Sequence, residues 1–103
     1  MPSVLPSVNT RIQRLRLTVR GIVQGVGFRP HVYGCASRCG VTGFVGNDTN
    51  GVFIEAEGET EGLQQFQQEL IAKAPPLAFI ESVTVNSIAV QRSKTFCIVE
   101  SAI

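Results

Sequence analysis

The fold of this chain is constrained most by one glycine-rich segment, Gly21–Pro30, in which Arg29 directly precedes the proline. The segment follows residues 15–20, where apolar and polar side chains alternate as in a strand, and precedes an apolar-periodic stretch that Pro30 can open as a helix. The sequence therefore predicts a strand, a tight loop and a helix N-terminus in succession. The N–H groups of such a loop and helix end, together with the arginine fork, predict a small cradle for an anion, most simply a phosphate.

The loop residues alone leave two interpretations open. The segment lacks the Gly-Lys-Ser/Thr of a Walker A loop and the third glycine of a dinucleotide-binding fingerprint. It is either a phosphate cradle of another kind or a tight turn in which Arg29 forms a surface ion pair. Asn47, at the end of the next predicted strand, is likewise either a turn residue or a carboxamide that holds a water molecule through one donor and one acceptor.

Length and composition place the chain among single globular domains. It has 103 residues, of which 44% are hydrophobic and 17% charged, and a chain of this length buries about 60–70% of its unfolded surface. A net charge of +1 offers no electrostatic footprint for nucleic acid or an anionic membrane. The sequence shows neither a signal-peptide pattern nor an apolar run of the ~20 residues that span a bilayer. We therefore expect a cytoplasmic protein with no nucleic-acid and no membrane partner.

The pattern of apolar residues predicts a βαββαβ order. Leu15, Leu17 and Val19 define a packed face of the first strand, and the residues that alternate with them, Arg14 included, define a solvent-exposed face. This favours a ferredoxin-like α/β sandwich, in which a mostly antiparallel sheet carries two helices on one face. The expected strands are 13–21, 41–46, 52–57, 79–90 and a short fifth at 95–99, the expected helices are 30–39 and 61–74, and residues 1–12 form a flexible tail before a domain that spans 13–103.

Several side chains carry local predictions. Pro30 is expected at the first helical position, where its missing N–H costs nothing, and Thr60 is expected to cap the second helix. Cys35 and Cys39 are assigned to core packing rather than to zinc, because the two further ligands that zinc needs have no candidates at suitable spacing. His31 is expected on the exposed side of the first helix.

Two linked blocks resemble the signature of the acylphosphatase family. Residues 19–29, Val-Arg-Gly-Ile-Val-Gln-Gly-Val-Gly-Phe-Arg, are similar to V-x-G-x-V-Q-G-V-x-F-R, and residues 40–47 are similar to the second block, G-[LV]-x-G-x-V-x-N. The turn Asn50-Gly51-Val52 fits the hairpin of the family, and order and spacing agree over residues 13–99. One position departs from the pattern, because Gly27 stands where acylphosphatases commonly carry a larger residue. That departure leaves the catalytic rate and the size of the substrate open.

Three segments point to a subgroup of this family. Phe28-Arg29-Pro30, Asn47-Asp48 and Pro75-Pro76-Leu77-Ala78 look more like the N-terminal acylphosphatase-like domain of the hydrogenase-maturation carbamoyltransferase. In that enzyme further domains follow this module. The resemblance therefore implies a domain of a longer chain, with the downstream domains as its partners, and a free-standing acylphosphatase is the alternative.

The resemblance also implies a role for each matched residue. Arg29 is expected to bind the phosphate of an acyl phosphate, and Asn47 is expected to orient the attacking water. The implied substrate is a mixed carboxylic–phosphoric anhydride, in the maturation enzyme carbamoyl phosphate, and its hydrolysis needs neither a metal nor another cofactor. The residues whose backbone N–H groups share the phosphate with Arg29 are Gln24, Gly25, Val26, Gly27 and Phe28.

Two other functions are compatible with the sequence. The domain is alternatively a non-catalytic module that binds phosphate or docks onto a neighbouring domain. Its predicted topology is also shared with RNA-recognition domains, which stack bases on aromatic side chains of the sheet, but no such aromatic motif is visible in this sequence.

Overall fold

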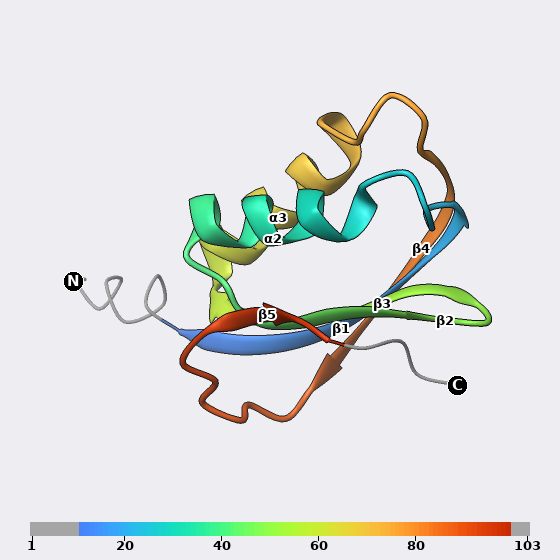
Figure 1. Cartoon of the computed structure of the whole chain (residues 1–103). Helices are drawn as coiled ribbons and strands as arrows, with labels where there is room; N and C mark the ends of the chain where they lie inside the picture. Colours follow the sequence, from blue (N-terminus) through green and yellow to red (C-terminus); the bar gives the residue numbers. More distant parts are fainter. Residues whose placement is uncertain (1–10, 100–103) are drawn as a thin grey trace.

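The structure, a computed structural model, describes residues 11–99. It forms a two-layer sandwich in which both helices cover one face of a five-stranded sheet (Figure 1). The strand order is β4-β1-β3-β2-β5, and every pair is antiparallel except β2 with β5. This confirms the predicted ferredoxin-like sandwich. The elements are β1 (Ile12–Ile22), α2 (Phe28–Cys39), β2 (Thr42–Asp48), β3 (Gly51–Glu59), α3 (Thr60–Ala72), β4 (Phe79–Ile88) and β5 (Phe96–Ile98).

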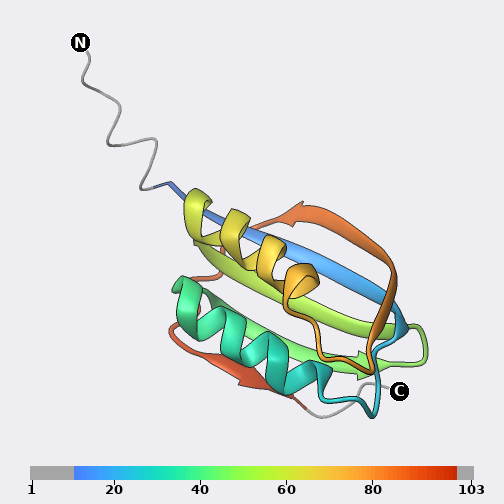
Figure 2. The same ribbon diagram turned by 90° about the horizontal axis from the view of Figure 1, so that it is seen from above.

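The hydrophobic core lies between the sheet and the two helices. On the sheet side, alternate residues of the central strands point inward, as the period of two requires, and Leu17 and Ile54 are fully buried. On the helix side, α2 packs over β2 and β5 while α3 packs over β3 (Figure 2). The buried helix residues recur every three to four positions and comprise Val32, Cys35, Ala36, Leu63, Phe66 and Leu70.

Both helices begin earlier than the sequence predicts. The first begins at Phe28 after the N-cap Gly27, so Pro30 lies within the first turn, where a missing N–H still breaks no intrahelical bond. The second begins at Thr60, and its N-cap is Glu59, which makes no side-chain capping bond. The prediction that Thr60 caps this helix is therefore wrong. The helix ends at Ala72 rather than Ala74. Ala74 precedes Pro75, and the residue before a proline disfavours helical backbone angles.

The face of the sheet away from the helices is partly covered, which the sequence does not predict. Strands β4 and β5 lie at opposite edges of the sheet, so the connection between them, residues 89–95, crosses beneath this face (Figure 1). Arg14 is buried under this connection with 1% exposure and Glu57 with 4%. The prediction of a solvent-exposed Arg14 is therefore wrong, because a non-local segment of the chain covers it.

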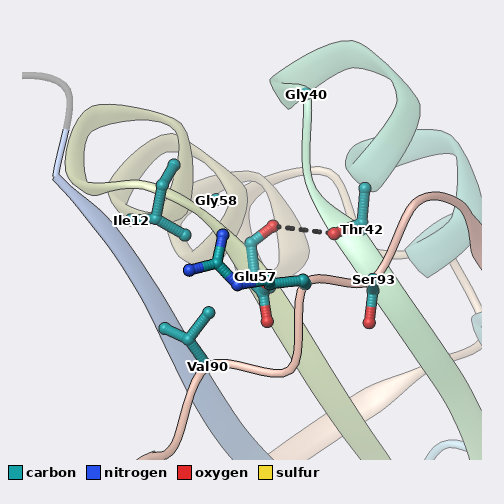
Figure 3. A pocket seen from close by; sticks show the side chains of 8 residues that line it. Ile12, Gly40, Thr42, Glu57, Gly58, Val90 and Ser93 are labelled. Atoms are coloured by element: carbon teal, nitrogen blue, oxygen red, sulfur yellow. Dashed lines mark hydrogen bonds between the residues drawn. The ribbon is translucent and has the colours of Figure 1, made fainter.

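A cavity of about 600 Å³ lies where this connection meets the first residue of β1, at the opposite end of that strand from the glycine-rich loop. Figure 3 shows Thr42, Glu57, Val90 and Ser93 around it. The hydroxyl of Thr42 donates to the carbonyl oxygen of Glu57 at 3.4 Å. The cavity is thus formed by the covering connection and the far end of the sheet.

The predictions for His31 and the cysteines have different outcomes. Cys35 is fully buried and Cys39 packs half-buried against the core, as predicted. His31 is half-buried rather than exposed, because α3 packs against this side of α2 and the Nε2 of His31 lies 3.0 Å from the carbonyl oxygen of Leu70. Neither helix within residues 11–99 is long and apolar enough to cross a membrane. The predicted flexible tail, residues 1–12, falls outside the described residues except for its last two positions.

Candidate active site

The glycine-rich loop is attached to the core through its apolar residues. Val23 and Phe28 at its two ends are buried, and Val26 between them packs half-buried against the core. Gly25 and Gly27 separate these anchors and adopt φ angles of 74° and 82°, in the left-handed region that side chains disfavour. The loop is thus shaped by glycines and held in place by buried side chains on either side of them.

The loop leads directly into the N-terminus of α2. The first bond to the loop runs from the His31 N–H to the Gly27 carbonyl oxygen at 3.2 Å, so by helix geometry the N–H groups of Phe28 and Arg29 have no intrahelical acceptor. The Gly27 N-cap supplies no side-chain bond to them. Free donors and the positive end of the helix dipole therefore meet at this point.

Arg29 is half-buried at this helix terminus. The ion pairs found within residues 11–99 involve Arg14, Arg16 and Arg38, and no carboxylate of that part of the chain pairs with Arg29. Its positive charge is therefore not neutralised by the described residues. The alternative of an ordinary surface ion pair has no carboxylate partner among them.

Strand directions bring Asn47 to the same end of the sheet as the loop. Because β1 and β2 both run antiparallel to β3, their C-terminal ends lie at the same end of the sheet. The loop follows β1 at this end, and Asn47 lies near the end of β2. Asn47 is half-buried and lies opposite Val52 in the hairpin register. The turn after it is closed by Asp48, whose Oδ1 accepts the Asn50 N–H at 2.8 Å. The loop and Asn47, which were predicted from separate parts of the sequence, thus lie at the same end of the sheet.

One contact between the loop and the hairpin was not anticipated from the sequence. The side-chain amide of Gln24 donates to the carbonyl oxygens of Asp48 at 2.8 Å and Gly51 at 3.1 Å. A shallow cavity of about 220 Å³ lies beside this contact, between the start of the loop and residues 49–51. The sequence predicts only a backbone role for Gln24. No spacing rule indicates a role for its side chain, because the partners are main-chain carbonyls of β2 and β3.

Cys35 and Cys39 do not contribute a nucleophile at this site. Burial raises the pKa of Cys35 and of Cys39, and Arg38 nearby offsets only part of that effect. Both thiols lie on α2 near α3, away from the loop, and are protonated at neutral pH. Within residues 11–99, no three His, Cys, Asp or Glu side chains converge as metal ligands. The described groups of the loop and its helix terminus are backbone N–H donors, the Arg29 guanidinium and the Gln24 carboxamide, and Asn47 lies at the same end of the sheet.

These features define a class of protein. The chain is a small α+β domain, a ferredoxin-like sandwich whose first strand runs through a glycine-rich loop into an arginine-bearing helix N-terminus. The model of the family described as Acylphosphatase matches residues 15–98. The chain therefore belongs to the acylphosphatase family, and the resemblance seen in the sequence is confirmed.

The relatives fall into two groups of very different length. A carbamoyltransferase HypF2 from Cupriavidus necator is 44% identical over 95 residues, which is 91% of this chain and 12% of the relative. An acylphosphatase from Thermotoga petrophila is 41% identical over 88 residues, 84% of this chain and 97% of the relative. A solved structure described as full-length HypF in the phosphate- and nucleotide-bound form superposes with a TM-score of 0.87 at 38% identity, covering 89% of this chain and 12% of that one. The chain thus spans about an eighth of the carbamoyltransferases and nearly all of the free acylphosphatase.

Proposed function

We propose that this domain hydrolyses acyl phosphates, with carbamoyl phosphate as substrate, and that it is the N-terminal domain of a cytoplasmic hydrogenase-maturation carbamoyltransferase. The observation that carries the proposal is the position of Arg29. Its guanidinium stands at a helix N-terminus without a carboxylate partner in residues 11–99, beside N–H groups that lack an acceptor within the helix. A phosphate dianion satisfies all of these groups at once.

The chemistry follows from the nature of the substrate. An acyl phosphate is an activated mixed anhydride. Attack of a water oxygen on phosphorus breaks the bond to the acyl oxygen and releases a carboxylate, or carbamate from carbamoyl phosphate, together with phosphate. The leaving group is a weak base, so it needs no protonation by a side-chain acid. Binding the phosphate in the loop stabilises the charge on its oxygens, and the Asn47 carboxamide holds the attacking water in line.

The choice of carbamoyl phosphate rests on the relatives. Carbamoyltransferases match this chain at 43–44% identity over at least 91% of its length, and three segments of the sequence already resembled their N-terminal domain. The phosphate-bound state named for the solved full-length relative supports a phosphate site in this fold. A free-standing acylphosphatase is the second candidate, because the chain also covers 97% of an acylphosphatase at 41% identity.

Steady-state hydrolysis of carbamoyl phosphate and benzoyl phosphate, measured beside the spontaneous rate, tests the proposal. We expect Arg29→Ala to lower kcat/KM by about 10²–10³-fold and to weaken the binding of inorganic phosphate, because both depend on the guanidinium. Asn47→Ala is expected to lower kcat by roughly 10²-fold while phosphate affinity changes by less than about twofold. A preference for carbamoyl phosphate favours the carbamoyltransferase domain, and a preference for benzoyl phosphate favours the general enzyme.

Two substitutions serve as matched controls. Arg11→Ala removes an exposed arginine at the opposite end of β1, and Asn50→Ala removes an exposed asparagine of the β2–β3 turn. Both are expected to retain wild-type turnover. If the folded wild-type domain shows no turnover above the spontaneous rate but binds phosphate, the enzymatic proposal is wrong and the non-catalytic binding module takes its place.

A further inference from the structure

The side chain of Gln24 connects the two halves of the site. Its Nε2 donates one N–H to the carbonyl oxygen of Asp48, at 2.8 Å, and the other to that of Gly51, at 3.1 Å. An amide nitrogen has two hydrogens, so both donors are used. Gln24 is an exposed residue, yet its side-chain amide is bonded to both strands of the β2–β3 hairpin.

The two acceptors, Asp48 and Gly51, form the register pair next to Asn47 and Val52 on the turn side of the hairpin. Asp48 directly follows Asn47, and Gly51 directly precedes Val52, which lies opposite Asn47 in the β2–β3 register. The bonds from Gln24 therefore hold both strands of the hairpin one residue away from the Asn47–Val52 pair. On the other side, Gln24 belongs to the phosphate loop through its own backbone.

The hairpin is also held close to β1 by the main chain. Gly51 has a φ of 136°, and a Cβ at this position would lie 2.3 Å from the carbonyl oxygen of Val19. Val19 precedes the loop by only a few residues. The close approach of the turn to β1 thus leaves no room for a side chain at Gly51, and the Gln24 amide bonds the same turn at Asp48 and Gly51.

We propose that Gln24 is a positioning residue, whose side chain sets the separation between the phosphate loop and the Asn47 carboxamide. This inference rests on the proposed hydrolysis. Turnover then depends on a side chain that contacts neither phosphate nor water, because an error of about 1 Å in the placement of a reacting group costs roughly 10²-fold in rate. The affinity for phosphate does not depend on it, because the loop is anchored separately by Val23, Val26 and Phe28.

The test compares Gln24→Met with Gln24→Glu and with the control Gln68→Met. Methionine keeps the length of the side chain without a donor, and glutamate places an acceptor against two carbonyl oxygens. Gln68 is exposed on α3 and far from the loop in sequence. We expect kcat for carbamoyl phosphate to fall by roughly 10–100-fold in Gln24→Met and further in Gln24→Glu. Inhibition by inorganic phosphate is expected to stay within about threefold of wild type, and Gln68→Met is expected to match wild type throughout.

A double-substitution cycle with Asn47→Ala separates positioning from a general structural effect. If Gln24 acts through Asn47, then Gln24→Met changes the residual rate of the Asn47→Ala variant by less than about threefold, because the group being positioned is already absent. An equal loss in both backgrounds overturns the inference. So does a parallel loss of phosphate affinity, or full kcat in folded Gln24→Met.

Failure of the inference is distinguishable from failure of the proposed function. A wild-type domain without turnover overturns the hydrolase proposal, and the geometry is then read from the side-chain amide resonances of Asn47 in ¹⁵N NMR spectra. Displacement of these resonances in Gln24→Met, but not in Gln68→Met, supports the positioning role. Unchanged resonances overturn it.

Discussion

The burial of Arg14 under the β4–β5 connection makes a quantitative prediction about stability. Its guanidinium donates from Nε to Glu55 at 2.9 Å, and from Nη1 to Glu57 at 3.0 Å and to Ser93 at 2.8 Å. The substitution Arg14→Met keeps most of the apolar stem and removes these bonds together with the charge. Two carboxylates, those of Glu55 and Glu57, then remain on one face of β3 without this cation.

The expected loss is set by the more buried of the two carboxylates. Glu55 keeps its pair with Arg16 at 3.0 Å, but Glu57 is 4% exposed and keeps only backbone donors of the connection, such as the Gln91 N–H at 2.8 Å. Removing one partner of a buried ion pair costs about 3–5 kcal/mol. We therefore expect Arg14→Met to lower the free energy of unfolding by about 3–5 kcal/mol. With a urea m value of about 1–3 kcal/mol/M, the unfolding midpoint falls by at least ~1 M.

Urea unfolding of the full chain, followed by circular dichroism, measures this loss. Arg16→Met is the matched control, because Arg16 is 42% exposed and has one ion pair, with Glu55, so its loss costs about 0.2–1 kcal/mol. The double variant Arg14→Met/Glu57→Gln is expected to be more stable than Arg14→Met, since it leaves no buried charge while an amide oxygen still accepts from Gln91. A loss below about 1 kcal/mol for Arg14→Met, or a double variant less stable than the single one, refutes this reasoning.

Two further predictions concern pH and backbone geometry. Burial raises the pKa of Glu57, but hydrogen bonds from Gln91 and Arg14 outweigh it, so this pKa lies below its ordinary value of 4.5. A carboxyl group with a lowered pKa stabilises the folded state fully above its ordinary pKa of 4.5, and this stabilisation is lost as the pH falls through the folded-state pKa. In an acid titration, we therefore expect Glu57→Gln to lose less stability below pH 4.5 than wild type. Gly27→Ala, with open space around the added Cβ, is expected to cost only the left-handed strain of about 1–2 kcal/mol. Gly51→Ala is expected to cost clearly more in the same urea assay, because its Cβ would lie 2.3 Å from a backbone oxygen, and equal losses would contradict this.

The order of elements and the position of the glycine-rich loop were predictable because they depend on local patterns. Alternation in β1 and the glycines before Arg29 are properties of consecutive residues, and the βαββαβ order follows from them. Helix starts were less accurate, since Phe28 is at once the last anchor of the loop and the first residue of α2. Because Pro30 is a favoured first helical residue, the sequence predicts a helix that begins at Pro30, two positions after Phe28.

The two residues wrongly predicted to be exposed, Arg14 and His31, share one physical cause, a neighbour distant in sequence. Arg14 was predicted to be exposed because it alternates with core residues of β1, and it is buried because a connection some 75 residues later crosses over it to join opposite edges of the sheet. His31 is half-buried because α3 packs beside α2. Neither contact leaves a periodic trace in the sequence around the residue concerned.

The sequence by itself predicted the fold class and the family, and both are confirmed, because local propensity and two linked motifs encode them. The same motifs predict the loop, Arg29 and Asn47 as the candidate site. Only the tertiary structure brought the loop and Asn47 to the same end of the sheet, because β1 and β2 both pair antiparallel with β3. It alone also revealed that the Gln24 side chain joins the loop to Asp48 and Gly51 of the β2–β3 hairpin, and that Arg14 and Glu57 form a buried pair. The reason is that these contacts depend on distances between elements, which the order of residues within each element does not specify.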